Sequence, residues 1–260
     1  MDKLGYIPGK SIIHRLYPLT KFTWLLIVSV LVFFINNGVL AFSLAVVFFL
    51  ILLAINPEIW KVRGLRLTLI TGAALFFMYL LFEKSGVPIF SSKIRLLTFT
   101  TGGLESGLLI SGRFWTTVFL SYIFILSTDP NHLAYALMKC GLSYRYGFML
   151  VTALRLAPLM EDEGRTIYKA QLVRGIQYDV RSIRKKFLII KQYLSPLLLS
   201  AIRRADKLFF SLEGRGFGKY PARTFRADTY PSILDVTASI ILILFLTCIF
   251  YLNFRVLNFT

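Results

Sequence analysis

The chain has 260 residues and a formal net charge of +17, and 56% of its residues are hydrophobic. This hydrophobic share is high for a soluble domain, and the apolar residues gather into long runs with almost no charge. The composition therefore argues against a soluble globular protein and favours a membrane protein.

A polar, Pro-containing segment, residues 1–21, opens the chain, and apolar runs follow it. Each run approaches the roughly 20 residues that a helix needs to cross a bilayer. We therefore predict about five spans, near residues 22–36, 39–55, 65–82, 104–127 and 232–252. No small-residue cleavage site follows the first run, so we expect its helix to remain as an anchor.

The distribution of Lys and Arg predicts the orientation. With the N-terminus inside, the inner segments 1–21, 56–66 and 128–231 hold four, three and eighteen of these cations. The outer segments hold only Lys84, Lys93, Arg95 and Arg255. By the positive-inside rule we expect a cytoplasmic N-terminus and an external C-terminus. The charge thus follows membrane topology and anionic lipid headgroups, and it does not indicate a nucleic-acid partner.

The fourth run contains two features with alternative explanations. Gly103, Gly107 and Ser111 place small residues on one helix face, which suits either packing inside the bundle or docking of another membrane subunit. Apart from Arg66 at the edge of the third run, Arg113 is the only cation within a predicted span, and it is either functional, structural and bundle-facing, or snorkelling toward water. Before this run, 83–103 is expected to be an irregular outer connection that can include a short interfacial helix.

The basic inner segment is predicted to be helical. Asp129 and Pro130 favour the start of a short helix that runs through Lys139 and ends at Gly141. Two long amphipathic helices follow, at about 144–174 and 182–215. Each contains a Pro-Leu pair, at Pro158 and Pro196, which is expected to bend it, and each closes on an Arg-Gly pair.

The pairs Arg174-Gly175 and Arg215-Gly216 have two explanations. Gly can adopt the left-handed conformation that ends a helix, and the cation complements the negative end of the helix dipole. Alternatively, two cationic tips at matching helix ends are aimed at clefts in a partner, because Arg suits carboxylates and carbonyls.

No pattern indicates a catalytic site, a metal site or a cofactor. Residues 214–219 lack the spacing and context of a phosphate-binding loop, so we do not expect this chain to hydrolyse ATP. The acidic run at 161–163 is interpreted as solvated charge or as an i,i+4 pair of Glu161 with Arg165. His14 and His132 lack a ligand pattern, and the only cysteines, Cys140 and Cys248, indicate neither a disulfide nor a zinc site.

Three stretches carry a resemblance to a known family. The best are Arg155-Leu-Ala-Pro158 through Gln171-Leu-Val-Arg174-Gly175, and Arg203-Arg204-Ala-Asp206 through Glu213-Gly-Arg215-Gly216-Phe217; a weaker one is Ser11 through Lys21. They resemble the transmembrane T component of energy-coupling factor transporters, which take up vitamins and transition-metal ions in prokaryotes. Val173 and Gly214 stand where that family usually has Ala.

The resemblance implies an all-α membrane bundle of about five spans with a cytoplasmic coupling domain of two or three long amphipathic helices. Its implied domains are 1–127, 128–231 and a C-terminal span in 232–260. It also implies a multi-pass protein of the prokaryotic cell membrane whose partners are two ATP-binding cassette subunits, a small substrate-binding membrane subunit (the S component) and the bilayer.

By the same resemblance, two helix ends seat in grooves of the ATPase subunits, and several residues support the helices. The implied contact residues are Arg174, Gly175, Arg215 and Gly216, and the supporting ones are Arg155, Pro158, Gln171, Pro196, Arg204, Asp206 and Glu213. Substrate choice, vitamin or metal, would reside in another chain. The alternatives are a self-contained secondary transporter or channel, which needs polar, broken spans, and a membrane-embedded transferase, which needs convergent acids or His.

Overall fold

The computed structural model describes residues 11–61, 63–85, 87–90, 99–176, 178, 182–219 and 232–257. The chain divides into two compact units. The membrane unit comprises Met1–Leu133 and Thr229–Thr260, and the arm unit comprises Ala134–Asp228. Lys93 and Arg95, counted above as outer cations, lie outside the described residues.

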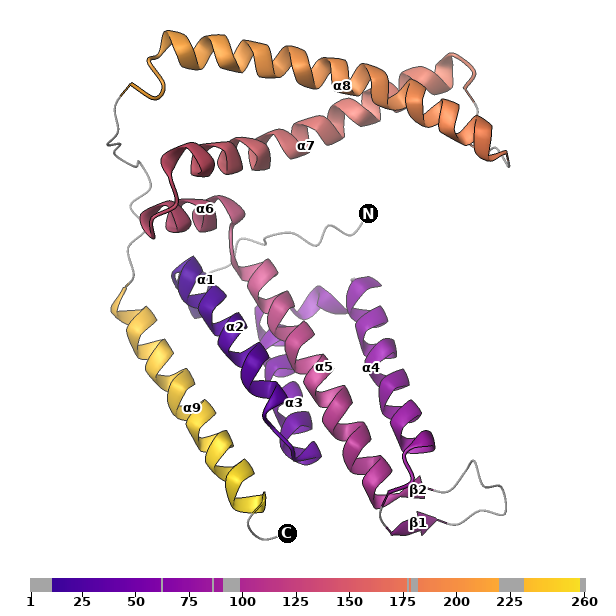
Figure 1. The fold of residues 1–260 in the computed structure, drawn as a ribbon, viewed down its shortest axis with the longest axis vertical. Helices are drawn as coiled ribbons and strands as arrows, with labels where there is room; N and C mark the ends of the chain where they lie inside the picture. Colours follow the sequence, from indigo (N-terminus) through magenta and orange to yellow (C-terminus); the bar gives the residue numbers. More distant parts are fainter. Residues whose placement is uncertain are drawn as a thin grey trace. The chain divides into compact units, whose positions relative to one another are not determined.

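Helices dominate both units, as the sequence predicts (Figure 1). The membrane unit contains a short antiparallel pair, β1 (Pro88–Phe90) with β2 (Phe99–Thr100). Its helices are α1 (Ile12–Arg15), α2 (Pro18–Phe33), α3 (Gly38–Ile55), the 3-10 helix η1 (Pro57–Lys61), α4 (Arg63–Phe82), α5 (Thr101–Ser127) and α9 (Ile233–Leu257). Helix α6 (Pro130–Lys139) leads into the arm unit, which contains α7 (Tyr144–Val173) and α8 (Ile183–Gly214).

Among the described residues, three helices are long and apolar enough to cross a membrane: α3, α4 from Gly64, and α5. Helix α2 and the stretch Ile233–Ile249 of α9 are apolar but shorter. These five helices correspond to the five predicted runs, and the number that cross the bilayer stays a prediction.

Two boundaries differ from the sequence-based expectation. Helix α2 begins at Pro18, four residues before the predicted run, because Pro at the first helical position already has a helical φ. In the connection predicted for 83–103, the described residues form the β1–β2 pair and the start of α5 instead of an interfacial helix.

Helix α5 packs against α2, α3 and α4, and its small residues face its neighbours. A Cβ atom added to Gly103 would lie 2.7 Å from Glu83 O, and one added to Gly107 would lie 3.1 Å from Phe76 O. Ser111 is fully buried and donates to Gly107 O at 2.7 Å. Of the two explanations for this face, packing inside the bundle is confirmed.

Arg113 has a structural role, because its side chain reaches the end of α2. Its Nη2 atom donates to Phe33 O at 3.0 Å and to Ile35 O at 2.6 Å. Carbonyls at a helix C-terminus have no partner within the helix, and Arg113 satisfies one of them, Phe33 O, together with the carbonyl of Ile35 just beyond α2. Nearby, Asn253 Nδ2 of α9 donates to Phe34 O at 3.2 Å.

We expect Gly112→Ala to destabilise the bundle. An added Cβ would lie 2.7 Å from Ala41 C and from Phe42 N, and these backbone atoms of α3 cannot rotate away. Overpacking of this kind costs about 1–3 kcal/mol. The measurement is the midpoint of thermal unfolding in detergent, with Gly214→Ala as the matched control, since nothing lies within 4 Å of a Cβ there. Equal midpoints for the two variants would contradict the close approach of α5 to α3.

Candidate functional site

The end of α7 has the geometry of a Schellman cap. Gly175 N donates to Leu172 O at 3.0 Å, and Ile176 N donates to Gln171 O at 3.1 Å. Gly175 has φ +79°, a conformation that side chains with a Cβ rarely adopt. The preceding residue, Arg174, is therefore the C-cap of α7, and it is exposed.

The end of α8 repeats this geometry. Gly216 N donates to Glu213 O at 2.9 Å, and Phe217 N donates to Leu212 O at 3.0 Å. Gly216 has φ +65°, and Arg215 is exposed at the C-cap. The predicted capping role of both Arg-Gly pairs is confirmed. Since the capping bonds use backbone atoms, they leave both guanidinium groups for other contacts.

Aromatic side chains hold the tip of α8 against the start of α7. The ring of Phe217 lies 4.6 Å from that of Phe148 and 5.5 Å from that of Tyr144, measured between centroids. Pairs at these distances are attractive beyond their buried area. Phe217 thereby fixes the turn that carries Arg215.

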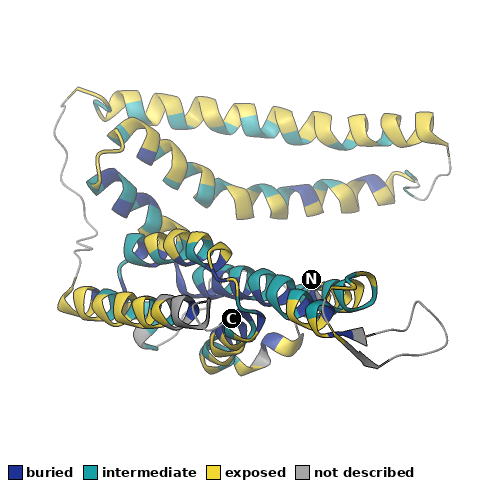
Figure 2. Ribbon diagram, turned by 60° about the horizontal axis from the view of Figure 1, so that its bottom comes forward, coloured by how far each residue is buried: buried dark blue, intermediate teal, exposed yellow. Residues whose placement is uncertain are grey.

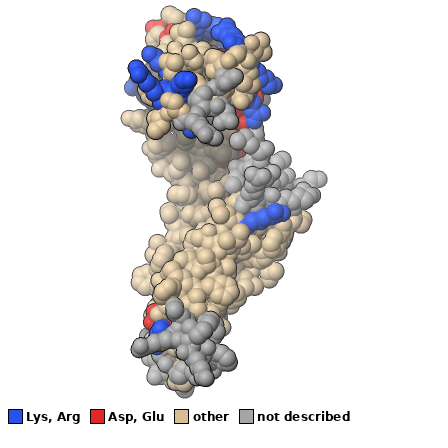
Figure 3. All heavy atoms as spheres, turned by 90° about the vertical axis from the view of Figure 1, so that its right-hand side faces the viewer, with Lys and Arg blue, Asp and Glu red and all other residues tan. Residues whose placement is uncertain are grey.

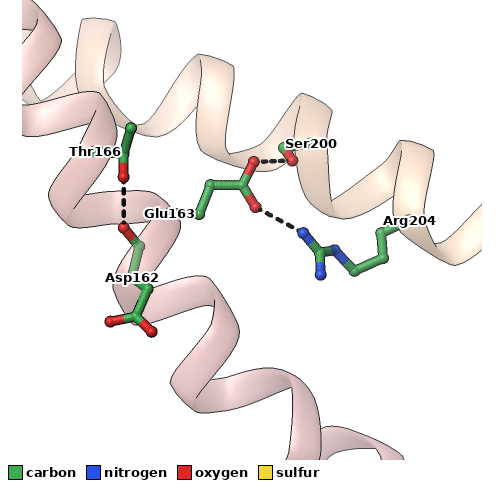
Figure 4. A network of polar contacts seen from close by, with 5 residues as sticks. All are labelled: Asp162, Glu163, Thr166, Ser200 and Arg204. Atoms are coloured by element: carbon green, nitrogen blue, oxygen red, sulfur yellow. Dashed lines mark hydrogen bonds and ion pairs between the residues drawn. The ribbon is translucent and has the colours of Figure 1, made fainter.

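Helices α7 and α8 cross (Figure 1), and an ion pair joins them. Arg204 Nη2 lies 3.1 Å from Glu163 Oε2, and Ser200 donates to the other carboxylate oxygen. Figure 4 shows Glu163 of α7 pointing at both residues of α8. Next to it, a Cβ on Gly164 would lie 2.4 Å from the Tyr193 hydroxyl, so Gly164 allows the close approach.

A second contact lies nearer the tip of α7. Gln171 is buried, and its Nε2 donates to Gln192 O at 2.8 Å. The Tyr178 hydroxyl donates to Gln171 Oε1, and the Tyr178 ring lies tilted against that of Tyr168, with 4.6 Å between the ring centroids. Desolvation, together with Tyr168 and Tyr193, raises the pKa of the Tyr178 hydroxyl above its ordinary value. Gln171 therefore ties together α7, α8 and the turn between them.

Three of the predicted supporting residues lie at contacts between the helices. Arg155 and Arg204 line one cavity of about 450 Å³ between α6, α7 and α8, together with the predicted contact residue Arg215, whereas Gln171 lies at the other contact. Pro158, Pro196, Asp206 and Glu213 are exposed, and both helices continue through their prolines.

Glu163 is a contact residue that the sequence pattern did not indicate. Its neighbour Glu161 pairs with Arg165 at 2.7 Å as expected, but Glu163 reaches across to α8 instead of remaining solvated. The only sequence signal at this position is a carboxylate that stands next to a glycine, Gly164, within a predicted helix.

The arms expose a large apolar surface. No residue described in α8 is fully buried, and a groove of about 540 Å³ follows one face of this helix. Figure 2 shows exposed residues along most of α8. The apolar side chains of the groove recur at helical spacing: Phe187, Ile190, Leu194, Leu198, Leu199 and Ile202. A continuous apolar face of this kind indicates contact with a protein or a membrane.

Cations gather on the arm unit. In the view of Figure 3, Lys and Arg form several patches on its surface, whereas the described surface of the membrane unit is mostly uncharged. Exposed apolar residues and cations thus share α7 and α8. Among the residues that the structure describes, no group of three or more His, Cys, Asp or Glu side chains is placed to hold a metal ion.

Comparison with known proteins identifies the family. The model of the cobalt transport protein family, CbiQ, matches residues 9–225. The chain is 31% identical to the energy-coupling factor transporter transmembrane protein EcfT of Streptococcus equi subsp. equi, over 96% of this chain and 97% of that protein. It is 34% identical to EcfT of Streptococcus thermophilus, over 97% and 100%, and 32% identical to that of Listeria innocua, over 84% and 85%. The chain therefore belongs to the CbiQ cobalt transport protein family and is an energy-coupling transmembrane component of energy-coupling factor transporters.

Proposed function

We propose that the two capped ends of α7 and α8 contact two ATP-binding cassette subunits, one at Arg174 and one at Arg215. The observation that carries the proposal is the repeated geometry: two crossed helices end in the same Schellman cap, each with an exposed Arg before the Gly. A guanidinium held at a defined helix end suits a groove lined with carboxylates or carbonyls.

The crossing of the arms supports a mechanical role. In this proposal ATP binding and hydrolysis occur in the partner subunits, and the movement of one tip reaches the other because Glu163 and Gln171 join α7 to α8. Arg155 and Arg204 flank the cavity near the α8 tip and support it. The chain would thus act as a lever and carry out no chemistry itself.

The apolar groove of α8 is the proposed contact for the substrate-binding membrane subunit. A partner that is itself hydrophobic would cover Phe187, Leu194 and Ile202, whereas a hydrated partner would leave this face exposed. The transported substrate, a vitamin or a transition-metal ion, would bind to that subunit. No observation favours a self-contained transporter or a transferase.

The orientation proposed for the chain is a cytoplasmic N-terminus, arms on the cytoplasmic side and an external C-terminus. The asymmetry of Lys and Arg supports it. ATP is available only on that side, which agrees with arms that contact ATPase subunits.

We expect Arg174→Glu and Arg215→Glu each to lower substrate uptake and recovery of the ATPase subunits, and the double variant to lower both much further. Removal of an interface Arg can cost about 2 kcal/mol or more, and charge reversal adds repulsion in an acidic groove. Uptake and co-purification are measured on the same membranes, with the exposed Lys207→Glu as the control for charge reversal. Normal uptake and partner recovery in the double variant would mean that both arginines serve only as helix caps.

We expect the pair Glu163–Arg204 to couple the arms more strongly than the pair Glu161–Arg165 stabilises α7. The first joins two helices and is partly buried, and the second is exposed within one helix. In a double-mutant cycle the residues of each pair are replaced by Gln and the thermal stability is measured. We expect a coupling energy of about 1 kcal/mol for the first pair and of less than about 0.5 kcal/mol for the second. Glu163→Gln is also expected to reduce uptake per ATP hydrolysed, and equal coupling energies would argue against the lever.

We expect Cys140 and a cysteine at position 84 to face opposite sides of the membrane. Cys140 and Lys84 are both exposed, and the proposed orientation places 140 inside and 84 outside. In a background with Cys248→Ser, a membrane-impermeant maleimide is added to intact cells. Lys84→Cys with Cys140→Ser is expected to react, and Cys140 alone is expected to react only after permeabilisation. The reverse labelling pattern would show that the orientation is opposite to the proposed one.

A further inference from the structure

The membrane unit contains a small polar cavity that the coupling role does not use. Its volume is about 180 Å³, and it lies where α1, the start of α2, the end of α5 and the start of α6 meet. Its lining includes Arg15, Lys21, Ser127, Thr128, Asp129 and His132. The volume is several times the share of one water molecule, which is about 30 Å³ in the liquid.

A buried ammonium group lies in the wall of this cavity. Lys21 is 6% exposed, and its Nζ donates to Ser127 O at 2.8 Å. An ammonium has three donors, and this bond is the one that Lys21 makes among the described residues. The carboxylate of Asp235 accepts from Tyr17 N and Ser232 N, and its charge acts on Lys21 from a distance without a direct ion pair.

Two buried hydroxyl groups line the same cavity. Ser127 is 2% exposed and Thr128 is 5% exposed, and neither side-chain oxygen has a hydrogen-bond partner among the described residues. A buried hydroxyl without a partner costs free energy, and such groups usually bind water or a ligand. Both hydroxyls lie near Lys21, whose ammonium group has further N–H donors for a ligand.

The charges of the lining favour an anion. Arg15 and Lys21 are cationic, and Asp129 is the acidic residue of the lining. Asp129 Oδ1 already accepts from Asn131 N at 2.8 Å and Asn131 Nδ2 at 3.1 Å. The remaining groups, two cations, two hydroxyls and the exposed His132, can all donate to an oxyanion.

We propose that this cavity binds a phosphate group, through Lys21, Arg15 and the hydroxyls of Ser127 and Thr128. Tetrahedral phosphate oxygens accept several donors at once, and a cavity of this size admits one phosphate. The group belongs either to the headgroup of an anionic phospholipid or to free phosphate. In both cases it satisfies the buried donors and joins α1 and α2 to the end of α5.

The test uses the full-length chain in detergent at constant ionic strength. Thermal midpoints are measured during titration with phosphatidylglycerol, with zwitterionic phosphatidylcholine, or with inorganic phosphate against chloride. We expect a saturable rise in the midpoint with phosphatidylglycerol if the source is lipid, or with inorganic phosphate if the source is the free ion. If neither phosphatidylglycerol nor inorganic phosphate raised the midpoint, the proposal would be overturned.

The variants Arg15→Gln and His132→Gln change exposed residues of the lining, so the fold is expected to survive, and unliganded midpoints check this. Their combination is expected to weaken the apparent affinity about tenfold, because charged hydrogen bonds are lost. The matched control is Arg66→Gln, an exposed cation outside the cavity. If the double variant binds as tightly as the control, the ligand lies elsewhere on the basic surface and the assignment is wrong.

Discussion

The structure of the arm unit depends on a crossing of two long helices that have almost no core of their own. No described residue of α8 is fully buried, and the buried residues of α7 are Gly147, Gly164 and Gln171. Hydrophobic burial within the unit is therefore small, and apart from the rings of Phe217, Phe148 and Tyr144 at the tip of α8 it does little to position the helix ends. Polar contacts join the arms along their length: the carboxylate of Glu163 and the amide of Gln171 each reach from α7 to α8.

This arrangement explains why apolar and cationic residues occur on the same helices. The apolar face of α8 needs a partner, and the exposed arginines at the two tips need a different one. A helix that had buried its apolar face within its own chain would have no surface left for a membrane partner. The stability of the arms and the assembly of the transporter are therefore coupled in this account.

Much of the fold follows from local sequence patterns. Apolar runs place α3, α4 and α5 within a few residues, and the Arg-Gly pairs predict both caps because only Gly readily adopts the conformation at 175 and 216. Contacts between distant residues could not be predicted in this way. Arg113 meets a carbonyl 80 positions away, and Glu163 meets Arg204 41 positions away. Periodicity indicates which face a residue occupies, but not which helix lies opposite.

In the proposed complex the two arginine tips touch the ATPase subunits while the apolar face of α8 touches a membrane partner. The direct test is site-specific photocrosslinking in native membranes, with the reactive group placed at position 174, 215 or 194. We expect adducts with ATP-binding cassette subunits from 174 and 215, and with the small membrane subunit from 194. Adducts of the tips with the membrane subunit alone, or of position 194 with the ATPases alone, would contradict it.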